Sequence, residues 1–287
     1  MNGEAPAEST SPGLPGLIAL PQAGRIPLVA TAYALGVALF LTLEPTRPLW
    51  LILTTLIVAL GSDGIVRSYS SSALGDAPAL KPGLLDTAPS LIVPVLFSLA
   101  VGFFLEVTVS GYWRIVGAIV SGGLLGGVLY GECLSLDIES ELYGTGRFIL
   151  NIATYLAAFA LFAVMYSYDV DLVSAALCVG LLTTVLAAEI LRETELMPPP
   201  VGRRSLRSLG FALAIGLIVA EARWALYFVP LEGFLAAVFL LLFFYVASGI
   251  AQHHLTGHLS RPVATEYGLV ASVGLLMVVL GRWLGGG

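Results

Sequence analysis

Long runs of hydrophobic residues recur along the chain, and each is separated from the next by a short polar segment. A helix needs about 20 apolar residues to cross about 30 Å of hydrocarbon. Nine runs meet this length, at 26–43, 48–66, 89–107, 113–131, 147–166, 170–191, 207–228, 230–251 and 266–284. The pattern therefore predicts an all-α fold, a polytopic transmembrane helix bundle with about nine spans.

Two boundaries between the predicted spans are tight. They are "YSYDVD" at 166–171 and "YFVPLEG" at 227–233. We place helix-breaking turns at both, because the first segment holds two aspartates and the second holds Pro230. A re-entrant hairpin at either place would change the number of spans and the topology.

The polar segments also suggest how the chain is organised. Residues 1–24 are rich in Pro, Gly, Ser and Ala and have no basic n-region, so we expect a disordered tail and no cleaved signal peptide. The prolines and arginines of 197–206 mark an internal boundary between a six-helix region, 25–196, and a three-helix region, 207–287. No tandem or inverted repeat is evident, which argues against the commonest transporter architecture.

Composition supports a membrane location. The chain is 57% hydrophobic and 11% charged, whereas a soluble domain carries about 25% charged residues. Membrane lipids are therefore the expected partners, with other membrane subunits as a further class. The net charge of −6 argues against a nucleic-acid partner. The two cysteines give neither a disulfide framework nor a paired metal site, and no cofactor is expected.

Basic residues predict the orientation, because those near span ends are retained in the cytoplasm. With nine spans, nine of the 13 lysines and arginines fall on the side of the N-terminus. The other four each lie near a tryptophan, and both residue types favour the headgroup zone. These pairs are Arg47/Trp50, Trp113/Arg114, Arg223/Trp224 and Arg282/Trp283. We expect a multi-pass protein of the cell (inner) membrane with a cytoplasmic N-terminus and an external C-terminus.

The segment "QHHLTGHL" (252–259) holds all three histidines of the chain. If the eighth helix continues through it, His254 and His258 stand at i and i+4 and could bind a metal ion, with Glu266 as a further ligand. Gly257 weakens that helix, and the segment lies at the cytoplasmic boundary. We favour histidines of the headgroup zone, with a metal site and a pH sensor as the alternatives.

Glu221 lies within the seventh predicted span. A charged carboxylate in the membrane costs a few kcal/mol, so we expect the side chain to face protein and to have a partner. Arg114 and Arg282 are candidates at a compatible depth. We interpret Glu221 as half of a structural ion pair; the alternative is a carboxylate that handles a proton or a substrate.

The other acidic residues lie at span ends or in loops, where we expect water or headgroups to reach them. At the span ends these are Glu106, Glu132, Glu189 and Glu232. The loop 131–147 carries four carboxylates and could hold a divalent cation. Its spacing matches no EF-hand, so a solvated acidic loop is the favoured interpretation.

The fourth predicted span contains pairs of glycines four residues apart, the small-xxx-small pattern of close helix packing in membranes. Its members are Gly122, Gly123, Gly126, Gly127 and Gly131. We expect a neighbouring helix to cross this span closely.

Arginines gather before the seventh span, at Arg203, Arg204 and Arg207. We expect these three side chains to contact anionic lipid headgroups on the cytoplasmic side.

No complete catalytic set is present. The only lysine, Lys81, lies in a loop, which excludes a retinal protein, and the His-Glu-x-x-His motif of intramembrane metalloproteases is absent. We favour a non-catalytic accessory protein or one that binds a lipid or another hydrophobic ligand. The alternatives are a small-solute or lipid transporter that uses Glu221, and a metal-dependent or lipid-modifying enzyme that uses His254, His258 and Glu266.

Overall fold

The computed structural model describes residues 25–44, 47–73, 84–137, 140–168, 170–192, 203–229, 231, 233–257 and 260–285. This part of the chain forms nine helices. They are α1 (Arg25–Thr42), α2 (Arg47–Ala73), α3 (Leu84–Thr108), α4 (Trp113–Leu134), α5 (Tyr143–Ser167), α6 (Leu172–Arg192), α7 (Arg203–Leu226), α8 (Gly233–Leu255) and α9 (Arg261–Gly285). The predicted all-α bundle is confirmed, because all nine helices are long and apolar enough to cross a membrane.

The tight boundary between α5 and α6 is a genuine helix break. The Ser174 backbone N–H donates a hydrogen bond of 3.0 Å to the Asp171 carboxylate, which caps the first turn of α6. Hydrogen bonds from Ser174 also hold the pKa of the Asp171 carboxyl below its ordinary value. The helices on both sides of this turn, α5 and α6, are each long and apolar enough to cross a membrane.

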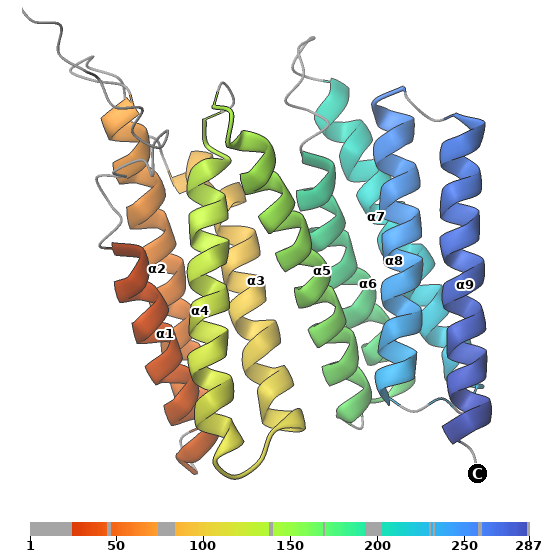
Figure 1. Cartoon of the computed structure of the whole chain (residues 1–287), viewed down its shortest axis with the longest axis horizontal. Coiled ribbons are helices and arrows are strands. Elements are labelled where there is room, and N and C mark those ends of the chain that lie inside the picture. The colour runs from red at the N-terminus through yellow and green to blue at the C-terminus, as the bar shows by residue number, and fades with distance from the viewer. Residues whose placement is uncertain are drawn as a thin grey trace, which may run out of the picture.

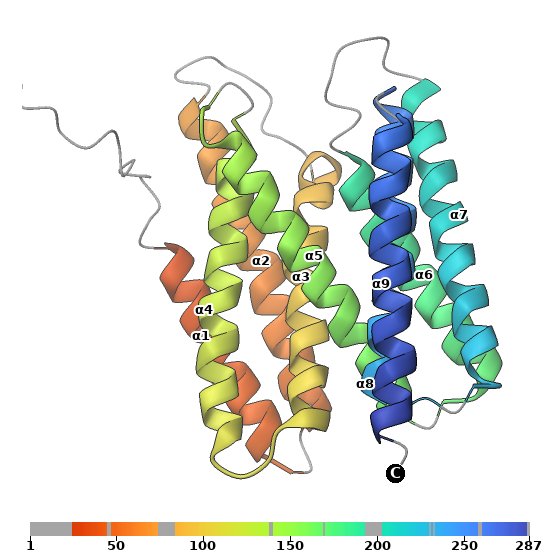
Figure 2. The same ribbon diagram turned by 45° about the vertical axis from the view of Figure 1, so that its right-hand side comes forward.

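The helices stand side by side in two groups, α1–α4 and α6–α9, with α5 between them (Figure 1). Helix α5 packs against α3 and α4 on one side and against α6 and α8 on the other. Figure 2, turned by 45° from Figure 1, shows the same two groups of helices. We call the end of the bundle with the α4–α5 connection the upper end and the opposite end the lower end, as they stand in Figure 1.

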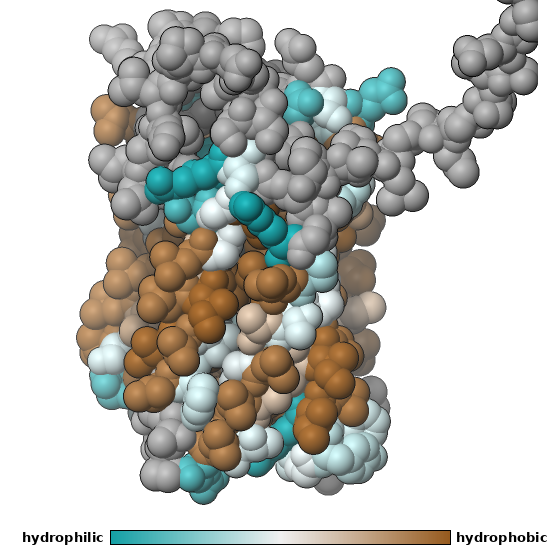
Figure 3. Space-filling model, turned by 90° about the vertical axis from the view of Figure 1, so that its left-hand side faces the viewer, coloured by the Kyte–Doolittle hydropathy of each residue, from teal (hydrophilic) through white to brown (hydrophobic). Residues whose placement is uncertain are grey.

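The outer surface is apolar around the middle of the bundle. On the face drawn in Figure 3, apolar side chains form a band, and the hydrophilic side chains lie mostly toward the two ends. Large apolar side chains point outward from this band, among them Leu28, Leu35 and Ile52. Such a surface suits hydrocarbon and would be unfavourable in water.

The glycine-rich helix α4 crosses α1 closely. A methyl group on Gly122 would lie 2.7 Å from the Ala34 Cβ and 2.9 Å from the Ala30 carbonyl oxygen. On Gly126, one turn further along, it would lie 3.5 Å from the Ala30 Cβ. Only glycine at position 122 allows this backbone approach, which supplies the van der Waals contact that membrane helices need.

The remaining glycines of the pattern divide into two kinds. A methyl group on Gly131 would lie 2.8 Å from the Ile149 Cγ2 of α5, so this glycine also sits in a close crossing. Gly123 and Gly127 are exposed, and a methyl group on either would meet nothing within 4 Å. The expectation of close crossing thus fits Gly122, Gly126 and Gly131, which face α1 or α5.

Candidate functional site

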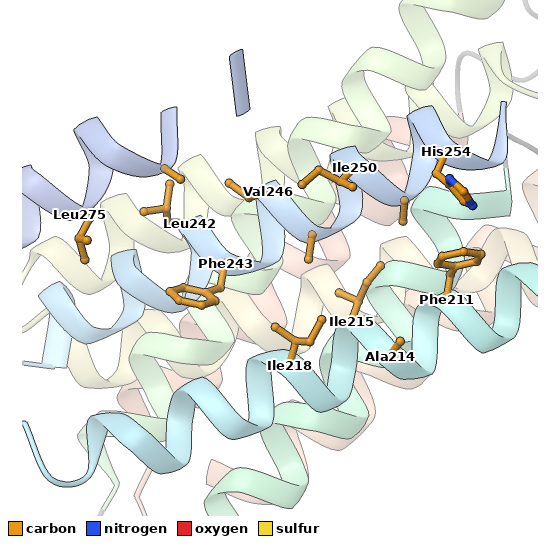
Figure 4. A pocket seen from close by; sticks show the side chains of 13 residues that line it. Phe211, Ala214, Ile215, Ile218, Leu242, Phe243, Val246, Ile250, His254 and Leu275 are labelled. Atoms are coloured by element: carbon orange, nitrogen blue, oxygen red, sulfur yellow. The ribbon is translucent and has the colours of Figure 1, made fainter. Parts of the chain in front are cut away.

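An open, apolar groove lies among α7, α8 and α9 and has a volume of about 610 Å³. Helix α8 packs against both α7 and α9, and side chains from all three helices line the hollow (Figure 4). These are Phe211, Ala214, Ile215, Ile218, Leu242, Phe243, Val246, Ala247, Ile250, Ala251, His254, Ala271 and Leu275. All but His254 are apolar.

Helical periodicity explains why these residues share one surface. Residues spaced three or four apart lie on the same side of a helix, and the lining of α7, from Phe211 to Ile218, follows that spacing. Small side chains alternate with large ones on these faces. Ala214 on α7 and Ala247 on α8 leave space that larger neighbours would fill, and the groove is the result.

The upper end of the groove is polar and carries charge. The Arg207 Nη2 lies 3.4 Å from the His254 Nε2. The Phe211 ring lies beside both groups, with its centroid 5.5 Å from that of the imidazole and 6.0 Å from the guanidinium carbon. Both polar side chains are exposed. We call Arg207, Phe211 and His254 the groove mouth.

The histidine segment does not continue the helix as the metal-site hypothesis requires. Helix α8 ends at Leu255, and Gly257 has a φ of 75°, a left-handed conformation that ends helices. His258 lies outside the described residues. Glu266 is exposed on α9. The part of the chain described contains no group of three metal-ligating side chains.

The predicted headgroup arginines begin α7. Arg203 is its first residue, and the side chains of Arg203 and Arg204 lie outside the described part of the structure. Arg207 follows one turn later and belongs to the groove mouth. Position 207 is therefore where the basic segment meets the apolar groove.

A second polar site lies at the upper ends of α4, α5 and α6. The Arg192 Nη2 lies 2.9 Å from the Glu189 Oε1 and 3.9 Å from the Glu132 Oε1. The Arg147 Nη1 lies 3.6 Å from the same Glu189 oxygen. We call these four residues the buried charge cluster. It joins three consecutive helices through two carboxylates and two guanidinium groups.

The burial of this cluster corrects the sequence interpretation. Glu132 and Glu189 were expected to be solvated, yet they are only 2% and 3% exposed. Arg147 is also buried, at 3%. Each carboxylate lies near the upper end of its helix, on the side that faces into the bundle, where α5 and its neighbours exclude water. The sequence did offer one signal of this cluster: acidic and basic residues lie at the same depth on adjacent helices. Such residues can pair, and buried charges must be compensated within the protein.

The expectation for Glu221 is not met. Its side chain is exposed on α7, whereas Arg223 is 6% exposed. The Arg223 guanidinium carbon lies 4.1 Å from the centre of the Tyr166 ring of α5. The two residues point about 200° apart on the helix, so the inward position of Arg223 leaves Glu221 outside.

Of the two proposed partners of Glu221, Arg114 has a described side chain, and it binds elsewhere. The Arg114 guanidinium donates to the backbone carbonyl oxygens of Leu41, at 3.0 Å, and Val109, at 3.5 Å. The side chain of Arg282 lies outside the described residues. Arg114 instead stabilises the lower ends of the helices around α4, and an exposed Glu221 gives no support to an intramembrane substrate site.

Comparison with known proteins identifies a family. The model of the family described as "Protein of unknown function (DUF5656)" matches residues 25–281. The chain belongs to this family, and the match includes all nine helices except the end of α9. No curated protein and no solved structure matches the chain.

Proposed function

We propose that this member of the DUF5656 family is a non-catalytic membrane protein that binds the hydrocarbon chain of a lipid in the groove of α7, α8 and α9. The observation that carries the proposal is the groove: about 610 Å³ of apolar space with one polar end. Ligand sites of proteins have volumes of about 300–1,000 Å³ and are lined mostly by apolar side chains with a few polar groups. The groove has both properties.

The length of the groove supports a lipid as the ligand. Its lining on α8 extends from Leu242 to His254, and a helix rises about 1.5 Å per residue, so it is about 18 Å long. Half of a hydrocarbon core is about 15 Å thick. A groove that begins at a polar mouth and extends for about one leaflet matches a lipid chain whose headgroup stays at the surface.

The alternation of large and small walls gives the physical basis for binding. Apolar surfaces gain little from meeting each other in lipid, so affinity there depends on close packing. A chain in the groove would contact Phe243 and Ile215 on opposite walls, whereas a chain on a flat helix face has protein on one side only. These extra dispersion contacts favour occupancy of the groove over the surrounding bilayer.

A pair of adjacent variants tests the proposal. Ala214 lies in the groove, and Leu213 is exposed on α7 outside it. Ala214→Trp should fill the groove, whereas Leu213→Trp adds the same ring to the lipid-facing surface. Both positions are exposed, so both variants should keep the fold. We expect native mass spectrometry from mild detergent to detect retained lipid on the wild-type protein and on Leu213→Trp, but not on Ala214→Trp.

A photoreactive lipid gives an independent readout. A phospholipid with a diazirine near the middle of one acyl chain should label the segments that line the groove, among them those that contain Ala247 and Ala271. Equal labelling of all lipid-facing helices, together with equal lipid retention by the two tryptophan variants, would refute binding in the groove.

We also propose that the upper end faces the cytoplasm and that the C-terminus lies outside. Trp113, Trp224 and Trp283 are exposed near the lower ends of α4, α7 and α9, in agreement with an aromatic belt at that surface. A single cysteine added at one terminus of the protein tests this orientation. In intact cells, a membrane-impermeant maleimide should label the cysteine at the C-terminus and not the cysteine at the N-terminus. Labelling of the N-terminal cysteine alone would reverse the orientation.

A further inference from the structure

We infer that the groove mouth recognises the phosphate of an anionic phospholipid, whose acyl chain lies in the groove below it. The inference rests on the proposed function, since it names the class of lipid that the groove selects. Its starting point is the position of Arg207 and His254 above an otherwise apolar surface.

The geometry of the mouth suits a phosphate group. The guanidinium of Arg207 is planar, permanently charged and able to donate two parallel hydrogen bonds to phosphate oxygens. The His254 Nε2 is 3.4 Å from the Arg207 Nη2, so one oxyanion could contact both side chains. Phe211 lies beside both groups and packs against them, which limits their freedom before a lipid binds.

The charge of the mouth is not compensated within the described residues. Arg207 contacts His254 and Phe211, and it forms no ion pair with a described carboxylate. This contrasts with Arg147 and Arg192, which both lie within 4.0 Å of Glu189. An exposed cation at the edge of a hydrocarbon groove attracts an anion from the surface, and the anionic lipids of the membrane supply one.

The positive charge at the start of α7 favours a lipid with an anionic headgroup. Arg203 and Arg204 occupy the first turn of α7, about one turn before Arg207, and add positive charge to this end of the helix. A choline or ethanolamine headgroup would bring its ammonium group to this basic end of the helix. A headgroup with net negative charge avoids that repulsion.

The test measures binding of two lipids with identical chains to delipidated protein in a neutral detergent. We expect dioleoyl phosphatidylglycerol to bind about tenfold more tightly than dioleoyl phosphatidylcholine, because it has a net negative charge and no ammonium group. Arg207→Gln should weaken the binding of both lipids, because both carry the phosphate, and should weaken phosphatidylglycerol more, so that most of the preference is lost. Arg207→Lys should retain part of it, because lysine keeps the charge but lacks the fork. Arg261→Gln is the matched control, since Arg261 is an exposed arginine at the same end of the bundle.

The outcomes separate this inference from the proposed function. If both lipids bind the wild-type protein equally and neither binds the Ala214→Trp variant, the groove holds a chain but the headgroup inference is wrong. If Ala214→Trp changes neither lipid, the proposed function fails. An equal loss in Arg261→Gln would mean general attraction to a basic surface. Competition by inorganic phosphate alone, without a lipid chain, would indicate a free-anion site and would also overturn the inference.

Discussion

Arginines and small residues have different surroundings in two regions of the bundle, around the buried charge cluster of α4, α5 and α6 and along the groove of α7, α8 and α9. Around α4, α5 and α6, arginines and small residues are enclosed: Arg147 is buried against Glu189, and Gly146 lies against the α4 backbone. In α7, α8 and α9, Arg207 is exposed and Ala214 faces an open groove. In the first region the arginines and the small residues are enclosed between helices. In the second region the guanidinium and the groove remain open.

The difference follows from how many helices surround each site. Helix α5 lies between the two groups and packs against α3, α4, α6 and α8. Helix α9, by contrast, packs mainly against α8, and 6% of its span is buried. A small residue between two crossing helices closes a gap, whereas the same residue beside a single neighbour leaves a hollow that lipid can enter.

The largest expected effect comes from removing a buried charge. Arg147→Gln should lower the free energy of unfolding by about 3–5 kcal/mol, because the carboxylates of the buried charge cluster lose one of their two cations. The measurement is reversible unfolding in mixed micelles titrated with sodium dodecyl sulfate. A decrease in the free energy of unfolding of less than about 1 kcal/mol would show that water screens the cluster. The two regions would then not differ in how their arginines contribute to stability.

A smaller loss should follow from filling the close crossing of α4 and α5. A methyl group on Gly146 would lie 2.8 Å from the Gly131 carbonyl oxygen and 2.9 Å from the Ser135 backbone nitrogen. Gly146→Ala should therefore destabilise the protein by about 1–3 kcal/mol in the same assay.

Gly144 provides the matched control in the same helix. A methyl group there would meet nothing within 4 Å. Gly144→Ala should be neutral or stabilising by up to about 1 kcal/mol, because alanine favours the helix. Similar losses in both variants would mean that helix propensity, not the close crossing, controls stability here.

The inward arginine of α7 should give an intermediate effect. Arg223 packs over the Tyr166 ring at 4.1 Å from its centre, and a cation–π contact shielded from water contributes about 2 kcal/mol. Arg223→Met should lower the free energy of unfolding by about that amount. Glu221→Gln, two residues away on the exposed face, should change it by less than about 0.5 kcal/mol. The reverse order would restore Glu221 as the structural residue.

The smallest effect on stability is expected at the groove mouth. Arg207→Gln should alter the free energy of unfolding in lipid-free detergent by less than about 0.5 kcal/mol, because the side chain is exposed. The same substitution at Arg147 should cost several times more. A large loss at Arg207 would assign it a role in packing and would remove the contrast between the two arginines.

The candidate site was only partly predictable. The sequence pointed to Arg207 as a lipid contact and to His254 as an interfacial histidine, but nothing in their spacing brought them together across two helices. Glu132 and Glu189 were interpreted as solvated because each lies near a helix end. Their burial depends on neighbouring helices that no single segment specifies.

The sequence by itself determined the number of helices, their approximate bounds and their membrane environment. This was possible because the length and polarity of each run report directly on the solvent around that segment. Only the tertiary structure decided which faces meet, which charges pair and where a groove stays open. These outcomes depend on many small packing contacts between distant segments, and helical periodicity gives the direction of a side chain without naming its neighbour.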